Sequence, residues 1–413
     1  MDNLTHTLIG LIAGESIARS TRPSERGLPA DARRGLFVAL AAIGGNLPDL
    51  DLLYSFQGLS HNKLVYLLQH RGYTHTVVGC VALALLLYVG AECWLRWKHL
   101  TPTRGDRLAL AGMALFGTML HLAMDALNSY GVHPFWPLQN RWFYGDSVFI
   151  VEPLYWIATA PLFFVMRSKL ARLVIALALL AALGVSGGLN LVPRLWCVGF
   201  AVLTGALLAV GARASARAAA LTSAAIMVLV TGVFLFAGRL AAQRVDSIAA
   251  LRFPADNMID HVLTSMPMNP VCWDVLLLET HADRYAIRHA VVSSAPQWVP
   301  AQKCPTTTVP QRTTAPMVEV AAPNSPDVHW LGEFSMSRTQ LIALVAADCD
   351  AAALMRFARA PFATRLERQW ILGDLRFDRE PQLGMAEIAL GANPGSTCPR
   401  TVPWTQPRAD LLR

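Results

Sequence analysis

The sequence predicts a mainly α-helical, polytopic membrane domain at residues 1–238 and a small soluble α+β domain at residues 239–413. Hydrophobic residues make up 54% of the 413 residues and the mean hydropathy is +0.38. Only 15% of the residues are charged, against about 25% in ordinary soluble domains. The net charge is +7, but the basic residues lie in short loops between apolar runs. This pattern favours a membrane protein over a nucleic-acid-binding protein.

About eight apolar helices are expected in the first domain. Six runs have roughly the 17 to 25 residues that cross a bilayer: 76–95, 108–127, 149–166, 170–189, 195–212 and 218–238. Two earlier runs, 4–18 and 35–47, are shorter. A helix of fifteen residues rises only about 22 Å, against a hydrocarbon core of about 30 Å. These two segments are therefore short tilted spans or re-entrant segments.

The distribution of lysine and arginine predicts the orientation. One set of alternate loops carries 14 of these residues and the other set carries 4. The positive-inside rule places the first set in the cytoplasm. The N-terminus and the domain after residue 239 then lie on the opposite side. The first ten residues, MDNLTHTLIG, have no basic region before the apolar residues and are not expected to be a signal peptide.

Four cysteines lie in the polar C-terminal part, namely Cys272, Cys304, Cys349 and Cys398. Their even number predicts two disulfides in an oxidising compartment, with the pairing open. The other three, Cys80, Cys93 and Cys197, lie in apolar runs and are expected to pack there. Period-two patterns predict a strand pair at 271–281 and 283–292 and further strands at 368–378 and 384–391, and residues 338–360 have a helical pattern.

The segment HLAMDALNSYGVHPFWP (121–137) contains the strongest local signal. His121 and Asp125 are four residues apart, so on a helix they share one face. Such a pair can bind one metal ion, and the alternative for the pair taken alone is a hydrogen bond between helices. Other histidines and carboxylates are predicted at helix ends on the same membrane face: His6, Asp49, Asp51, His70, His75, Asp146 and Glu152.

A shared metal centre explains this convergence. Ionisable groups near a membrane are costly unless they are paired, bound to metal or in contact with water. Neighbouring carboxylates also repel one another unless cations compensate them. The mixed imidazole and carboxylate set suits Zn, with Mn or Fe as alternatives, and one to three ions are expected. We assign no ligand role to Glu15, His61 or His133, and Glu92 is expected to pair with a nearby arginine. His133 and the following FWP segment are predicted to form an interfacial lip beside the site.

The chemistry expected of such a centre is hydrolysis. A bound metal lowers the pKa of water, supplies hydroxide near neutral pH and neutralises anionic oxygens, which favours a phosphoester substrate. Arg71 is the first candidate, and Arg141 the second, to stabilise charge on the transferring group. Asp51 is a candidate general base.

Several motifs in order resemble the YdjM-like family of bacterial inner-membrane proteins: MDNLTHTLIG, NLPDLD, HRGYTHT, HLAMDALNSYGVHPFWP and GDSVFIVEPLYW. The resemblance covers about residues 1–160. It implies a multi-pass protein of the bacterial inner membrane that is classed among metal-dependent hydrolases. It also implies metal-binding roles for His6, Asp49, Asp51, His70, His75, His121 and Asp125. The order of these residues is loosely analogous to zinc-dependent phospholipases C and nucleases.

The sequence therefore predicts a membrane-embedded metal-dependent hydrolase with a periplasmic site and C-terminal domain. Its expected partners are membrane lipids and a lipid or lipid-linked phosphoester, with no nucleic acid and no protein partner indicated. The alternative is a non-catalytic, metal-stabilised membrane scaffold or envelope-stress factor, in which protein ligands fill every metal position. A transporter is disfavoured because the ionisable residues gather at one face, whereas transport sites lie near the midplane.

Overall fold

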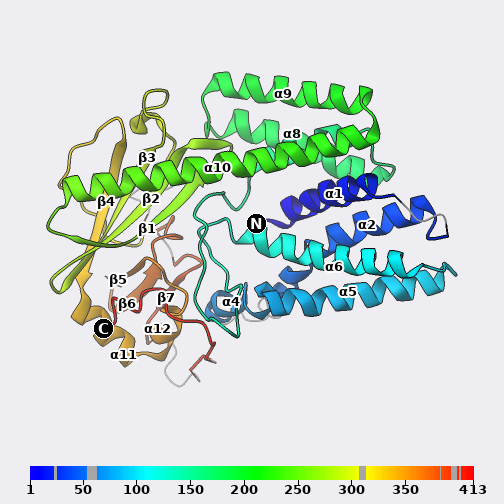
Figure 1. The fold of residues 1–413 in the computed structure, drawn as a ribbon. Coiled ribbons are helices and arrows are strands. Elements are labelled where there is room, and N and C mark those ends of the chain that lie inside the picture. The colour runs from blue at the N-terminus through cyan, green and yellow to red at the C-terminus, as the bar shows by residue number, and fades with distance from the viewer. Residues whose placement is uncertain (23–25, 54–62, 307–312, 382, 392–397, 400) are drawn as a thin grey trace.

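The computed structural model describes the chain except residues 23–25, 54–62, 307–312, 382, 392–397 and 400. His61 lies outside the described residues. A bundle of helices forms one end of the molecule and two antiparallel sheets form the other (Figure 1). The N-terminus lies where the bundle meets the sheets, so the first residues of the chain are at the boundary of the two regions.

Four helices form the first half of the bundle: α1 (Asn3–Ser20), α2 (Ala30–Gly44), α5 (Val77–Trp97) and α6 (Arg104–Asp125). Helices α1 and α2 approach closely at Gly10, where an added Cβ would lie 2.6 Å from the Cα of Ala42. The missing side chain permits backbone contact of the kind common between membrane helices. Most of α1 is buried by this packing.

Within the described residues, five helices are long and apolar enough to cross a membrane: α5, α6, α8 (Lys169–Gly188), α9 (Arg194–Arg213) and α10 (Ala216–Arg252). Helix α2 with the segment Leu47–Leu53, bent by 50°, makes a sixth if the pair is one broken span. The predicted number of about eight is therefore not confirmed.

The predicted span 149–166 is wrong as a continuous helix. It contains only the short helix α7 (Pro153–Ile157) and the 3-10 turn η3 (Ala160–Leu162). Pro161 has no N–H to donate to the carbonyl of Ile157, so the helix stops there. The segment still runs the length of the bundle. Its Ile150 carbonyl accepts from the N–H of Asp2, and its Val165 carbonyl accepts from Arg34 near the opposite end.

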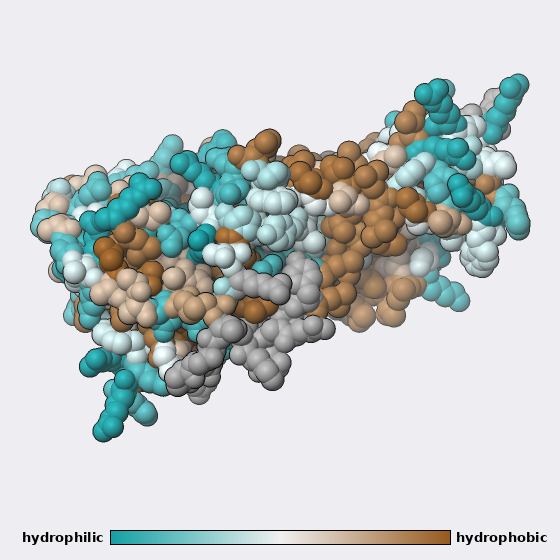
Figure 2. Space-filling model, turned by 90° about the horizontal axis from the view of Figure 1, so that it is seen from below, coloured by the Kyte–Doolittle hydropathy of each residue, from teal (hydrophilic) through white to brown (hydrophobic). Residues whose placement is uncertain are grey.

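Apolar side chains cover the outside of the bundle. Figure 2 shows a hydrophobic belt between a hydrophilic tip and the more hydrophilic sheet region. The exposed residues include Leu85 and Leu86 of α5, Leu180 of α8, and Leu229 and Phe236 of α10. An apolar surface of this size is stable in contact with lipid rather than water.

The C-terminal domain contains two sheets. The larger has the order β1 (Asn257–Met266), β2 (Asn269–His281), β3 (Arg284–Ser293) and β4 (Val328–Ser337), and the smaller has β5 (Pro361–Leu366), β6 (Gln369–Asp374) and β7 (Glu387–Ala389). The predicted strand pair is confirmed as β2 and β3, which are antiparallel. The helical prediction corresponds to α11 (Arg338–Ala347) and α12 (Cys349–Leu354). Helix α10 continues past residue 239 and packs along the larger sheet (Figure 1).

Both predicted disulfides are present, and the structure supplies the pairing. Cys272 is bonded to Cys304, and Cys349 to Cys398. Of the remaining cysteines, Cys80 is buried as expected, but Cys93 is exposed on the outside of α5.

Candidate metal centre

The candidate centre lies at the end of the bundle that faces the C-terminal domain. Its residues come from α1, from the end of α6, and from two 3-10 turns, η1 (Leu47–Leu50) and η2 (Tyr73–His75). The short helix α4 (Lys63–Gln69) leads into η2. Helices α2 and α6 touch at Gly117, where an added Cβ would lie 2.8 Å from the carbonyl oxygen of Leu40. This close approach brings η1, which follows α2, beside His121.

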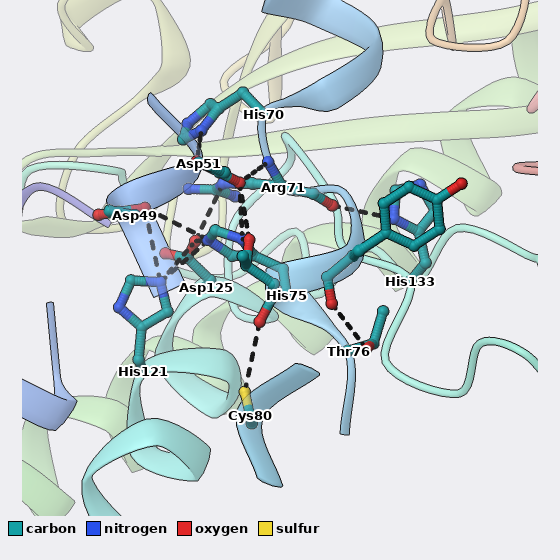
Figure 3. Close-up of polar contacts among 12 residues, drawn as sticks. Asp49, Asp51, His70, Arg71, His75, Thr76, Cys80, His121, Asp125 and His133 are labelled. Atoms are coloured by element: carbon teal, nitrogen blue, oxygen red, sulfur yellow. Dashed lines mark hydrogen bonds and ion pairs between the residues drawn. The ribbon is translucent and has the colours of Figure 1, made fainter. Parts of the chain in front are cut away.

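Four buried side chains form the first group: Asp49, His75, His121 and Asp125 (Figure 3). The Nε2 atoms of His75 and His121 are 3.0 Å apart. The Asp49 Oδ1 atom lies 3.3 Å from His75 Nε2 and 3.6 Å from His121 Nε2. The Asp125 Oδ2 atom lies 3.4 and 3.6 Å from the same two nitrogens. The local prediction that His121 and Asp125 share one face is confirmed.

The hydrogen bond made by the Nδ1 atom of each imidazole shows which ring nitrogen carries the hydrogen and which carries a free lone pair. His121 Nδ1 is 2.8 Å from the carbonyl oxygen of Gly45, which can only accept, so this nitrogen carries the hydrogen. His75 Nδ1 lies 3.2 Å from a carboxylate oxygen of Asp51, which favours the same tautomer. Both Nε2 lone pairs then point at each other and at two carboxylates. This arrangement is repulsive without a cation between them.

The donor set therefore fits a metal ion. Asp125 Oδ2 is buried and accepts no hydrogen bond from the described residues, so it retains a lone pair for a ligand. Histidine ligands commonly donate their second nitrogen to a carbonyl or carboxylate, as His121 and His75 do here. Two imidazoles and two carboxylates suit Zn and related divalent ions.

A second group, Asp49, Asp51 and His70, shares Asp49 with the first. His70 Nδ1 is 2.9 Å from Asp51 Oδ1. Asp51 Oδ2 also accepts from the N–H of Arg71 at 2.8 Å and from the hydroxyl of Thr74 at 2.9 Å. Burial lowers the pKa of His70, which keeps this imidazole neutral and able to bind a metal.

His6 lies against the first group rather than inside it. Its ring stacks on His121 with the centroids 3.9 Å apart, and its Nε2 is 3.2 Å from Asp125 Oδ1. The amino nitrogen of Met1 also contacts Asp125. His6 therefore supports the orientation of two residues of the first group and is within reach of the centre.

Arg71 is buried and faces the first group. Its Nε is 3.0 Å from Asp125 Oδ2, although the geometry is that of an ion pair and not of a hydrogen bond. Its Nη1 donates to the side-chain oxygen of Asn128 at 2.9 Å. The second candidate, Arg141, is exposed at the surface.

The structure does not bring Asp146 or Glu152 into either group. Asp146 accepts from Arg359 of the C-terminal domain at 2.8 Å. Glu152 accepts from the N–H groups of Leu154 and Met268, each at 3.0 Å. Glu152 lies outside the membrane-spanning segments, and burial raises its pKa to about 8. Both carboxylates found partners in the C-terminal domain that local spacing does not reveal.

The expectations for the remaining polar residues have mixed outcomes. Glu92 contacts Arg107 at 3.3 Å, which confirms the expected pairing with a nearby arginine. Glu15, to which no ligand role was assigned, pairs with Arg34 at 2.6 Å. The predicted lip is wrong for His133, which is fully buried. Its ring packs between Trp142 and Trp404, with centroids at 3.9 and 4.0 Å, because the C-terminal domain covers this segment.

The residues that cover the candidate centre from the C-terminal domain were not predicted. The Trp404 indole donates to the carbonyl oxygen of Leu68 at 2.9 Å, just before His70. Arg376 donates to the carbonyl oxygen of Ser129 at 2.7 Å. Asn128 and Tyr130, which follow Asp125 in the chain, complete the surroundings of Arg71. The polar sequence NSYG (128–131), three residues after Asp125, was a signal for Asn128 and Tyr130, whereas no sequence pattern marked Trp404 or Arg376.

Comparisons with known proteins agree with this placement. The family model described as the YdjM inner membrane protein matches residues 1–193, a stretch that contains every residue of both groups. No curated protein and no solved structure matches the chain.

Proposed function

Given that residues 1–193 match the model of the YdjM inner-membrane protein family, we propose that the protein is a membrane-embedded metal-dependent hydrolase. Its substrate is a phosphoester in a lipid or lipid-linked molecule. The observation that carries the proposal is the pair of Nε2 lone pairs on His75 and His121, held 3.0 Å apart beside two carboxylates.

Two ion positions follow from the two groups. Asp49, His75, His121 and Asp125 would hold one ion, and Asp49, Asp51 and His70 a second. Zn is the first candidate, and Mn and Fe bind similar donor sets. When bound, such ions neutralise phosphoryl oxygens and promote ionisation of water near neutral pH.

The surrounding side chains have distinct roles in this proposal. Arg71, buried beside Asp125, stabilises negative charge on the phosphoryl group. Asp51 is better suited to orient ligands than to accept a proton. Its two oxygens already contact His70, His75, Thr74 and the N–H of Arg71. The earlier assignment of Asp51 as general base is therefore replaced by a positioning role.

The location of the centre supports a lipid substrate. His121 and Asp125 lie in the last turns of a helix that is apolar enough to span a membrane. The hydrophobic belt of the bundle ends at the sheet region, which is the side on which the centre lies (Figures 1 and 2). A phosphoester headgroup can reach this depth while its hydrocarbon chains stay in the bilayer.

The first experiment measures bound metal in the full chain purified in detergent. Wild type is expected to hold at least one divalent ion per chain, and His121→Ala and Asp125→Ala are expected to lose nearly all of it. His281→Ala changes an exposed histidine on β2 and serves as the control. Hydrolysis of a nitrophenyl phosphodiester and of short-chain phospholipids should fall at least hundredfold in the first two variants. Full metal retention by both variants would contradict the proposal.

One observation favours the scaffold alternative. The first group offers four buried protein ligands, the number that closes a tetrahedral structural site. Cobalt substitution distinguishes the two functions. An absorption spectrum that changes on addition of phosphate indicates an open position and favours the hydrolase. A spectrum that stays unchanged, together with no turnover of any phosphoester, favours the metal-stabilised scaffold.

A further inference from the structure

Two buried polar atoms beside Arg71 have no hydrogen-bond partner among the described residues. They are Nδ2 of Asn128 and the hydroxyl oxygen of Tyr130. Both residues are almost completely buried, with 3% and 6% of their surface exposed. A buried polar group without a partner costs about 1 to 3 kcal/mol. Two of them on residues that both contact Arg71 point to a group from outside the chain that satisfies them.

The identity of the free Asn128 atom follows from its other contacts. The side-chain oxygen accepts from Arg71 Nη1 at 2.9 Å and from the N–H of Tyr130 at 3.0 Å. Because both partners can only donate, the atom they contact must be the carbonyl oxygen. The atom left over is therefore the NH2 group. It is a hydrogen-bond donor, attached to the same carbon as the oxygen that Arg71 holds.

Tyr130 provides a second donor at the same place. The Arg71 guanidinium lies over the Tyr130 ring, with Cζ 4.6 Å from the centroid, and the His70 ring makes a T-shaped contact with it, with the two centroids 5.8 Å apart. A tyrosine hydroxyl carries a hydrogen that it can donate, and in Tyr130 this hydroxyl is buried without a partner. Phe357 and Phe377 of the C-terminal domain cover the ring, with centroids at 5.2 and 5.8 Å. This cover keeps bulk water away from the hydroxyl.

We propose that Arg71, the Asn128 NH2 group and the Tyr130 hydroxyl form a subsite for the oxygens of a phosphoryl group. The Arg71 guanidinium and the Asn128 NH2 group can only donate, the Tyr130 hydroxyl can donate its hydrogen, and Arg71 adds a positive charge, which together match an oxyanion. Asp125 links the subsite to the metal centre because it contacts both Arg71 and His75. The proposal rests on the proposed function in so far as the metal centre is its neighbour.

Two conservative variants test the subsite. Tyr130→Phe removes only the hydroxyl and keeps the ring under Arg71. Asn128→Asp replaces the free donor by an oxygen of nearly the same shape. In the metal-loaded full chain in detergent, each is expected to weaken phosphate binding at least tenfold, measured by titration calorimetry. Metal content should stay at the wild-type value, because neither residue belongs to the ligand groups.

Tyr144→Phe is the matched control. The Tyr144 hydroxyl is also buried without a partner, but its ring lies against Arg359 and Arg376 and not against Arg71. Phosphate affinity should be unchanged in this variant. If Asn128→Asp fails to fold, Tyr130→Phe decides the result, since it preserves the packing.

Two ligands distinguish the sources of the phosphoryl group. Inorganic phosphate tests the bare anion, and a short-chain glycerol phosphonate tests a lipid headgroup. A loss of affinity for both in Tyr130→Phe supports a general phosphoryl subsite, and a loss for the phosphonate alone assigns the subsite to lipid headgroups. Two results overturn the subsite: wild-type affinity for both ligands in both variants, or no binding of either ligand by the wild-type protein. Ordered water would then be the partner of the two buried polar atoms.

The outcomes also separate this subsite from the proposed hydrolase. Phosphate binding that depends on Tyr130 without any turnover supports the subsite and contradicts the hydrolase. Turnover by wild type, with unchanged phosphate and phosphonate affinity in both variants, supports the hydrolase and contradicts the subsite.

Discussion

The C-terminal domain and the membrane bundle bury carboxylates in different ways. In the domain two groups of carboxylates are paired with an arginine. Arg288 contacts Glu279, and lies 2.8 Å from both Glu333 and Asp256. Arg376 pairs with Asp374 at 2.7 Å. These charges are balanced within the chain, as buried charges must be.

The bundle does not balance its own charge at the centre. Three buried carboxylates, Asp49, Asp51 and Asp125, lie together. Within the described part of the chain, Arg71 is the one Lys or Arg side chain that contacts them, and the Met1 amino group also contacts Asp125. His75 and His121 add no positive charge when their Nε2 atoms carry lone pairs, because the imidazoles are then neutral. At Arg288 and Arg376 the domain therefore supplies its own cations, whereas the centre in the bundle keeps carboxylates for the proposed metal ion.

Glu152, at the boundary of the two regions, is a buried carboxyl group that is neutralised in a third way. It is fully buried, and no ion pair involves it in the described structure. Burial raises its pKa to about 8, so a proton neutralises it near pH 7. The same kind of side chain is thus neutralised by arginine, by the proposed metal, or by a proton, according to its neighbours.

The largest expected effect comes from removing a domain arginine. Arg359 lies 2.8 Å from both Asp146 and Asp260, and all three side chains are mostly buried. Arg359→Met leaves two carboxylates without their main partner and should cost about 4 kcal/mol of unfolding free energy. Thermal unfolding of the full chain measures the loss. Arg167→Met removes an exposed partner of Asp31 and should change little; equal shifts for both would contradict the comparison.

Metal removal should have the next largest effect. A ligand present at a hundred times its dissociation constant adds about 2.7 kcal/mol to stability. Chelation is therefore expected to lower the melting temperature of wild type, because the carboxylates at the centre repel one another, and added Zn²⁺ should restore it. His121→Ala should show no further response to the chelator. A wild-type melting temperature that ignores chelation and Zn²⁺ would count against the cation requirement.

The pH dependence of stability tests the protonated carboxyl. The folded pKa of Glu152, about 8, exceeds its ordinary value of 4.5, so its proton is held more tightly in the folded state. Stability should therefore fall as the pH rises from about 4.5 to about 8, by at most about 1.4 kcal/mol per pH unit. Glu152→Gln cannot ionise and should remove this part of the slope. Identical slopes in urea unfolding from pH 5 to pH 9 would show that Glu152 is ionised in the folded protein.

The smallest expected effect concerns the contact between the domain and the centre. Trp404→Phe removes the hydrogen bond to the Leu68 carbonyl and should cost about 1 kcal/mol. Trp298→Phe, at a position that is 76% exposed, is the control and should be neutral. If Trp404→Phe leaves the melting temperature unchanged, this hydrogen bond does not stabilise the contact between the C-terminal domain and the candidate centre.

Regular local patterns were predicted well from the sequence. The apolar runs of α5, α6, α8, α9 and α10 were recognisable because a spanning helix needs only length and hydrophobicity. The same criterion wrongly predicted a continuous helix at residues 149–166, because hydropathy does not include the effect of Pro161 on helix hydrogen bonding. The four cysteines indicated two disulfides, but their pairing required the positions of residues 32 and 49 apart in the chain.

For the candidate centre, the residue types indicated the available donor groups. The residues of NLPDLD, HRGYTH and the His121–Asp125 pair supply imidazoles and carboxylates, and local spacing placed His121 and Asp125 on one face. Which of these groups meet depends on how the helices and turns pack together. Asp146 and Glu152 pair with Arg359 and the Met268 N–H instead, and Trp404 covers the loop that holds His70. These partners lie more than a hundred residues away, and a side chain's neighbours at that separation depend on the packing of whole elements, which local patterns do not encode.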